Sequence, residues 1–175
     1  MYPVARQLKL PFAHYKVSGY SFGQNVVSSN ACRGIHLGED ARCGAGAKIK
    51  AIGSGQVVYC GIHLGAPRKG NWGGIVIIGH RHHKTKNNFY SLYGHLSEQY
   101  CQIGDKVKAG QIIGLVGRSY TPENGFWPAH LHFAIYVGPW TGVVLPGYFR
   151  EGGNRTRMEY WQNPSKFIRV YNKTK

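Results

Sequence analysis

Short apolar runs separated by glycine-rich turns recur along the middle of the chain, from Gly34 to Val137. Each run has the length of a strand, is rich in β-branched or aromatic residues and ends at turn-forming residues, which is typical of β-structure. No segment shows a sustained apolar stripe at the 3.6-residue period of a helix. The pattern therefore predicts an all-β fold. The clearest runs are residues 56–59, 74–78, 89–93, 111–116 and 130–137.

Two stretches of the chain resemble each other. Residues 46–51 (GAKIKA) match 104–109 (GDKVKA), and residues 55–58 (GQVV) match 110–113 (GQII), with a three-residue insertion in the first copy. A duplicated strand–turn–strand unit predicts a compact antiparallel β-sandwich or open barrel with pseudo-duplicated hairpins. Independent convergence on a simple hairpin sequence is the alternative interpretation.

The chain divides into three regions on composition. Residues 1–30 are expected to form an N-terminal arm and a first strand, the strand at 15–23. Residues 31–138 form the core, and 139–175 a C-terminal tail that packs back on the core and frays at its end. The tail has three apolar residues suited to that packing, Trp161, Phe167 and Ile168.

The charge balance is strongly basic. Twenty-two Lys and Arg face seven Asp and Glu, giving a net charge of +15, which predicts an anionic partner. No recognition helix or RNA-binding motif supports specific nucleic-acid binding. No apolar run approaches the ~18 residues of a membrane span. The first fifteen residues lack the apolar run of a signal peptide, so either the chain is not exported by that route or a signal has been removed.

The four cysteines, Cys32, Cys43, Cys60 and Cys101, include no CxxC pair, which argues against a cysteine-based zinc ribbon. Cys32 and Cys43 bracket a short loop and could form a disulfide. The alternative is that all four are partly buried thiols.

Three groups of polar residues carry candidate chemistry. His130 and His132 lie two apart at the start of a predicted strand, so they project from the same face. His36 and Asp40 lie four apart in a glycine-rich stretch, and Asp40 is one of only two aspartates. Each motif alone has an ordinary interpretation, a packed histidine pair in a sheet or a carboxylate that caps a turn. His95 ends another predicted strand.

Taken together, the three groups predict a metal site. His36, Asp40 and His132 would supply three ligands suited to Zn²⁺ and leave a fourth position for water, as in catalytic zinc sites. His130 would lie beside that water, and His95 could approach it from the opposite side. Histidines of near-neutral pKa can move the protons of amide hydrolysis.

The chain resembles the lysostaphin-like zinc endopeptidases, which cut peptidoglycan cross-links. The resemblance implies that His36, Asp40 and His132 bind zinc and that His95 and His130 are catalytic. It also implies a long substrate groove whose walls are the loops 63–73, 81–88 and 118–129, the last of which departs from the short loop usual in the family. The matching segments, in family order, are GYSFG at 19–23, GIHLGED at 34–40, KIKAIGSGQVVYCG at 48–61, GGIVIIGH at 73–80, SLYGHLS at 91–97, GDKVKAGQIIGLVG at 104–117 and PAHLHFAI at 128–135.

From this resemblance we expect a monomeric, zinc-dependent endopeptidase that hydrolyses amide bonds in peptidoglycan cross-links or stem peptides. It would act outside the cytoplasm, as a secreted, periplasmic or phage-delivered protein, and its charge would attract anionic wall polymers. One alternative is a non-catalytic module of the same fold that binds the cell wall or regulates a hydrolase. Another is a carrier domain modified at a hairpin lysine such as Lys50 or Lys108. His80, His82 and His83 fit a solvated loop better than a second metal site.

Overall fold

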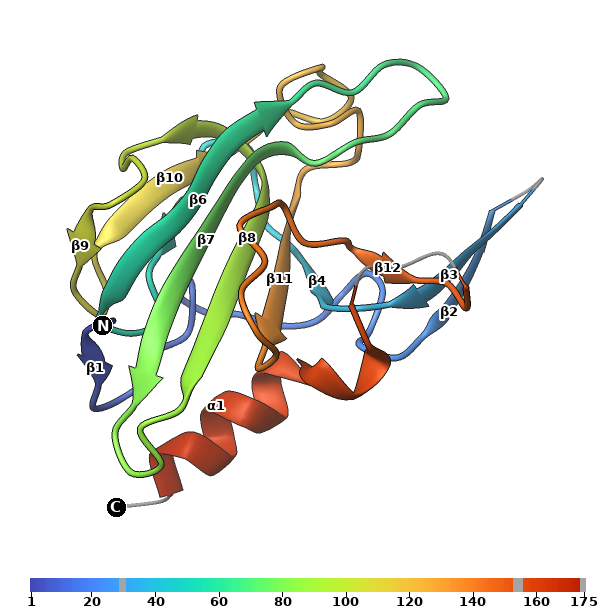
Figure 1. Cartoon of the computed structure of the whole chain (residues 1–175). Helices are drawn as coiled ribbons and strands as arrows, with labels where there is room; N and C mark the ends of the chain where they lie inside the picture. Colours follow the sequence, from blue (N-terminus) through green and yellow to red (C-terminus); the bar gives the residue numbers. More distant parts are fainter. Residues whose placement is uncertain (29–30, 153–155, 174–175) are drawn as a thin grey trace.

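The computed structural model of the chain describes residues 1–28, 31–152 and 156–173. A large sheet forms the body of the molecule, and a smaller sheet projects from one side of it (Figure 1). The large sheet contains β1 (Val4–Ala5), β4 (Glu39–Arg42), β5 (Lys48–Lys50), β6 (Gly55–His63), β7 (Gly73–His82), β8 (Asn88–Gln99), β9 (Lys106–Val107), β10 (Ile112–Val116), β11 (His130–Tyr136) and β13 (Trp161–Gln162). The small sheet contains β2 (Asn25–Ser28), β3 (Ala31–His36) and β12 (Tyr148–Phe149).

The strands of the large sheet follow the order β13–β11–β8–β7–β6–β9. The short strand β4 pairs with β11, and β10 pairs with both β5 and β8. Neighbouring strands are antiparallel except β1, which runs parallel to β7. The sheet does not close into a barrel. The predicted all-β, antiparallel fold is therefore confirmed.

Both faces of β7 are covered, because the strand contributes to two hydrophobic cores. Val76 and Ile78 lie in one core, whereas Ile75 and Ile77 lie in the other. Side chains of a strand alternate between faces, so an unbroken apolar run requires apolar neighbours on both sides. The run at 74–78 thus marks the centre of the molecule.

The two repeated segments are related in the structure, but they are not hairpins. β5 of the first copy pairs with β10 of the second, and β6 of the first pairs with β9 of the second. Each copy therefore completes its pairing with the other copy rather than within itself. The turns that open the two copies both contain a glycine with positive φ, Gly46 at 78° and Gly104 at 98°. A backbone of this conformation strains other residues, which explains why both copies begin with glycine.

The N-terminal segment differs from the prediction. Residues 15–23 are not a strand, and the first strand of the small sheet begins later, at Asn25. The segment still follows β4, because Ser18 and Gly19 donate backbone hydrogen bonds to the Asp40 carbonyl and Tyr20 accepts one from the Asp40 amide. Its strand-like composition reflects this partial pairing, which is too irregular to form a ladder.

The C-terminal segment ends in a helix that the apolar pattern did not predict, α1 (Pro164–Lys173), preceded by a short 3₁₀ turn, η1 (Met158–Tyr160). The Oδ1 atom of Asn163 accepts a hydrogen bond from the Lys166 amide at 2.8 Å, and Pro164 occupies the first turn. Both are typical of a helix start. Ile168 and Tyr171 bury one face of the helix in the core that contains Val76 and Ile78, which we call the first core.

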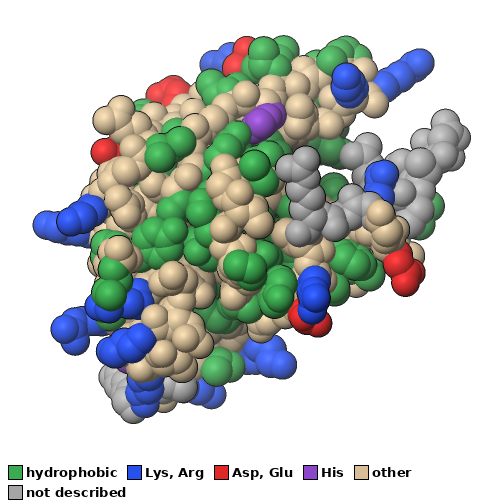
Figure 2. All heavy atoms as spheres, in the orientation of Figure 1, with side chains coloured by type: hydrophobic (Ala, Val, Ile, Leu, Met, Phe, Trp, Pro, Cys, Tyr) green, Lys and Arg blue, Asp and Glu red, His purple; other side chains and the backbone are tan. Residues whose placement is uncertain are grey.

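Lys and Arg side chains project around much of the visible surface, with a group at the end of the molecule where the β7–β8 turn lies (Figure 2). Among the described residues, no helix has the length and apolar character needed to cross a membrane. Cys43, Cys60 and Cys101 are free thiols. The side chain of Cys32, and with it the Cys32–Cys43 disulfide considered above, lies outside the part of the chain that the structure describes.

Candidate metal centre and groove

Pairing between β4 and β11 brings two of the predicted metal ligands together. The register places His132 opposite Asp40 and His130 opposite Arg42. Residues that face each other across an antiparallel pair project from the same side of the sheet. His36 is the last residue of β3 in the small sheet, and two residues separate it from the start of β4. The site therefore lies where the two sheets meet.

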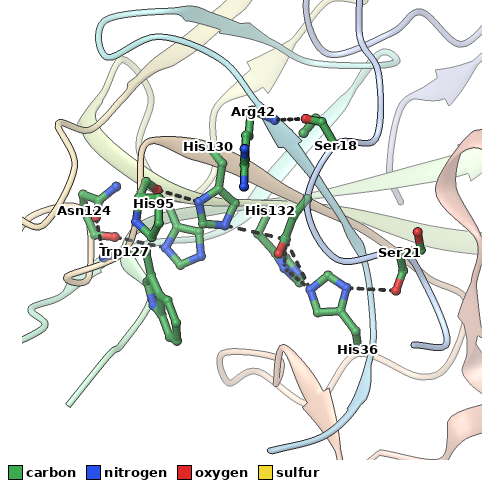
Figure 3. Close-up of polar contacts among 12 residues, drawn as sticks. Ser18, Ser21, His36, Arg42, His95, Asn124, Trp127, His130 and His132 are labelled. Carbon is green, nitrogen blue, oxygen red and sulfur yellow. Dashed lines mark hydrogen bonds and ion pairs between the residues drawn. The ribbon is translucent and has the colours of Figure 1, made fainter. Parts of the chain in front are cut away.

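The three candidate ligand atoms form a compact triangle. Asp40 Oδ1 lies 3.2 Å from His36 Nε2 and 3.0 Å from His132 Nδ1, and the two nitrogens are 3.0 Å apart. All three side chains are buried. Figure 3 shows His36 and His132 pointing toward each other from separate strands. The predicted association of His36, Asp40 and His132 is thus present in the fold.

The chemistry of this triangle fits a cation. His36 Nδ1 lies 3.2 Å from the Ser21 carbonyl oxygen, which can only accept, so Nδ1 carries the proton and Nε2 presents a lone pair. Asp40 supplies a carboxylate oxygen, and His132 Nε2 is buried without a hydrogen-bond partner among the described residues. When neither His36 Nε2 nor His132 Nδ1 carries a proton, these two nitrogens and the Asp40 oxygen can bind one cation together. Tetrahedral zinc ligands at ~2.1 Å are separated by about 3.4 Å, close to the observed edges.

The ionisation states agree with metal binding. Burial disfavours the Asp40 carboxylate, but hydrogen bonds with His132 and His36 outweigh that effect and hold the pKa of Asp40 well below its usual value. Burial lowers the pKa of His132 to about 4, against the opposing effect of Asp40. At neutral pH the pair is a carboxylate and a neutral imidazole. These are the forms in which both groups bind metal.

His95 reaches the site because β8 is irregular at this point. Tyr93 and Leu96 both lie in the first core although they are three residues apart, so the strand contains a bulge between them. His95 has a φ of 66°, in the left-handed region. In a regular strand His95 would share the face of Tyr93 and point away from the groove. The bulge turns its imidazole onto the face of His130, a common effect of bulges near active sites.

His95 and His130 are held in the same tautomer by backbone carbonyls. His95 Nδ1 donates to the Asn124 carbonyl at 3.0 Å, and His130 Nδ1 donates to the Pro128 carbonyl at 2.6 Å. Each neutral ring therefore presents Nε2 as a proton acceptor. The ring centroids are 4.5 Å apart, and His130 Nε2 lies 3.6 Å from Asp40 Oδ1. Burial lowers the pKa of His95 well below its usual value, and the neighbouring histidines add to this effect.

A groove of about 680 Å³ contains this cluster. Two of the three expected walls are present, because residues 70–72 and 127–128 line it. The expectation for the 81–88 loop is wrong. That loop joins β7 to β8 at the end of the strands away from the groove. Asn88, where β8 begins, is seven residues from His95, which is about 24 Å of extended chain. It packs instead on α1, where the Tyr171 hydroxyl accepts a hydrogen bond from the His83 amide.

The two walls brace each other through close backbone contacts. Gly125, with a φ of 80°, lies so near the 63–73 loop that a Cβ atom there would sit 2.1 Å from the Asn71 carbonyl oxygen. The indole Nε1 of Trp127 donates to the same carbonyl at 2.9 Å. The Asn124 side chain accepts from the Trp127 amide at 2.8 Å. This bracing fixes the carbonyl that orients His95.

The remaining histidine cluster is structural. His80 is buried, with Nδ1 donating to the Ser54 carbonyl and Nε2 accepting from the Ser91 hydroxyl. His82 and His83 stack on each other and pack against Tyr171 of α1. Among the described residues, the side chains that converge closely enough to hold a metal ion are those of His36, Asp40 and His132, and this cluster is not one of them.

Several groove residues had no signal in the sequence. Ser21 and Asn124 act through backbone carbonyls, which any residue could provide. Tyr148 and Arg150 line the groove from the C-terminal segment, and Arg42 lines it from the end of β4. Only the three-dimensional arrangement brings these residues to the site.

Comparison with known proteins agrees with this geometry. The profile of Peptidase family M23 matches residues 34–143. Lysostaphin of Staphylococcus simulans is 33% identical over 153 residues, which cover 82% of this chain and 28% of that protein. Glycyl-glycine endopeptidase ALE-1 of Staphylococcus capitis is 35% identical over 121 residues, 69% of this chain and 29% of that protein. The chain thus spans less than a third of the length of these curated relatives.

Solved structures show the same similarity. The catalytic domain of lysostaphin from Staphylococcus simulans superposes with a TM-score of 0.56 at 29% identity, and the match covers 89% of this chain and 92% of that domain. The similarity to the longer relatives therefore lies in a region that matches a catalytic domain nearly end to end.

Proposed function

The chain belongs to Peptidase family M23, and on that premise we propose that it is a zinc-dependent endopeptidase that hydrolyses amide bonds in peptidoglycan cross-links or stem peptides. The observation that carries the proposal is the triangle of His36, Asp40 and His132 at the base of a groove that also contains His95 and His130. A non-catalytic module would have no need for this whole set.

His36, Asp40 and His132 would hold the zinc ion, leaving a fourth position open to the groove. When bound, zinc polarises a carbonyl and lowers the pKa of a bound water toward ~7. The hydrogen bond from His36 Nδ1 to the Ser21 carbonyl fixes the tautomer that directs Nε2 into the site. Such supporting bonds commonly set metal affinity.

His95 and His130 would handle the protons of hydrolysis. Both rings donate from Nδ1 to the backbone, so Nε2 of either ring can take a proton from the attacking water and return it to the leaving amine. The lowered pKa of His95 keeps it neutral and able to accept at neutral pH. The carbonyls of Asn124 and Pro128 hold the rings in place during the transfer.

The groove walls would bind the peptide. The Trp72 ring packs against Gly94, where a Cβ atom would sit 2.7 Å from it, and lies beside His132 with ring centroids 4.9 Å apart. Trp127 also lies beside His95, at 6.2 Å between ring centroids. An extended peptide between these indoles would present its amides to the histidines.

We also propose that the protein acts outside the cytoplasm, at the cell wall, where its net charge of +15 would draw it to anionic wall polymers. This attraction is electrostatic, so wall binding should weaken as salt rises.

The test is release of new amino groups from purified peptidoglycan. The zinc-loaded protein should release amines from at least one wall chemotype, and a chelator or the His130→Ala substitution should abolish the release. Mass spectrometry of the fragments would identify the bond. If the zinc-loaded protein binds walls of several cross-link chemistries but releases no amines, the enzyme proposal fails and the wall-binding or regulatory module is favoured.

A further inference from the structure

Arg42 has a position in the groove that the proposed reaction does not use. It is the last residue of β4 and lies directly opposite His130 on β11. Side chains paired in this way share one face of the sheet, with Cβ atoms about 5 Å apart. Figure 3 shows the Arg42 side chain extending toward the space between His130 and His132. Arg42 also lines the groove.

The guanidinium of Arg42 has no partner within the described part of the chain. Its backbone amide donates to Ser18 Oγ at 2.9 Å, which fixes the end of the strand, but no hydrogen bond or ion pair involves its side chain there. The side chain is exposed to the groove. An arginine held in place at its backbone, with its five donors unused, is available to a ligand.

The groove has no carboxylate to neutralise Arg42. Of the described residues that line it, Asp40 alone is acidic, and its Oδ1 is shared among His36, His130 and His132. Arg150 adds a second positive side chain to the lining. The two arginines outnumber the one carboxylate, so the lining carries an excess of positive charge that attracts anionic groups.

We propose that Arg42 binds a carboxylate of the substrate peptide close to the scissile amide. This inference rests on the proposed function, and it narrows the substrate class to acidic peptides. The planar guanidinium can bind a carboxylate through two parallel hydrogen bonds, which fixes both distance and orientation. A run of glycines carries no charge between its ends and would leave Arg42 unused. The position beside His130 places the recognised carboxylate near the reacting amide.

Two sources of carboxylate have the same chemistry: a side-chain or branch carboxylate within the peptide, and the free α-carboxylate at its end. The test therefore uses two pairs of synthetic stem-peptide dimers. In each pair one such carboxylate is either free or converted to the amide, and the rest of the molecule is unchanged. The pair in which amidation matters identifies the source.

Each peptide is measured with the zinc-loaded wild type, Arg42→Gln and Arg42→Lys. Lys48→Gln serves as the control, because Lys48 is exposed on β5, does not line the groove and loses the same charge. The readouts are kcat/KM and equilibrium binding by calorimetry. For the wild type and Lys48→Gln, the free acid should exceed the amide by about 10- to 100-fold in one pair, as expected for a charged hydrogen-bonded pair. That ratio should fall to near one in Arg42→Gln and be partly retained in Arg42→Lys.

The inference is overturned if the wild type does not distinguish acid from amide in either pair, or if Arg42→Gln keeps the wild-type ratio. Failure of the proposed function gives a different result, since the wild type would then cleave none of the peptides. In that case the calorimetric ratio decides: a carboxylate preference that disappears in Arg42→Gln supports the site, and equal binding overturns it.

Discussion

Adding a single methyl group at Gly38 should displace a zinc ligand. A Cβ atom at this position would sit 2.7 Å from His132 Nε2 and 2.6 Å from the Phe133 carbonyl oxygen. Ordinary contacts begin near 3.4 Å, so the His132 ring or the backbone would have to move by about 0.7 Å. Zinc–ligand distances tolerate only about 0.2 Å. We therefore expect Gly38→Ala to weaken zinc binding by about 10- to 100-fold, the usual effect of disturbing the groups that hold a ligand in place.

The assay is competition for zinc against a chromophoric chelator, with circular dichroism to confirm that the variant is folded. Gly44→Ala is the matched control, because a Cβ atom at Gly44, just after β4, meets nothing within 4 Å and its φ is not positive. The control should bind zinc as the wild type does. If folded Gly38→Ala also binds zinc with wild-type affinity, His132 is not held as the structure indicates or is not a ligand.

Three further results are expected. His130→Ala and His95→Ala should each lower the rate of amine release by about 10²- to 10⁴-fold while zinc content stays unchanged, and loss of zinc from either variant would contradict a proton-transfer role. Burial lowers the pKa of His80 to about 4, so the unfolded chain, with a pKa near 6.5, takes up a proton first as the pH falls. Stability should therefore be lost between about pH 6.5 and 4, by about 3 kcal/mol from this residue, and urea unfolding of His80→Gln should show a correspondingly smaller loss across that window; an equal loss would contradict the assignment. Asn163→Ala should destabilise the protein by about 1 kcal/mol in urea unfolding because it removes the cap of α1, and an unchanged midpoint would argue against that cap.

The central strands of the large sheet were predictable because a strand buried on both faces has an unbroken apolar run in its sequence, as at 74–78 in β7. The helix α1 was not predicted, since it is less than three turns long. Its signals are nevertheless present: Asn163 and Pro164 start a helix, and Phe167, Ile168 and Tyr171 repeat at helical spacing. The pairing of the repeats with each other could not be read from either copy alone.

The site shows the same division. His130 and His132 follow from the two-residue period of a strand, and the sequence placed His36 and Asp40 with them. His95 was predicted from its sequence motif. Its orientation depends on a bulge and a left-handed φ, which the alternation of side chains along a regular strand would not predict. The assignment of the 81–88 loop to the groove failed because it ignored the length of β7 and β8. Arg42 could be placed only once the β4–β11 register was known.

The central claim, that three distant side chains share one zinc ion, is tested most directly by anomalous diffraction at the zinc absorption edge from crystals of the zinc-loaded protein. The expected result is one strong peak within about 2.0–2.2 Å of His36 Nε2, Asp40 Oδ1 and His132 Nδ1. A zinc-loaded crystal with no peak between these atoms, or with its peak on other residues, would contradict the claim.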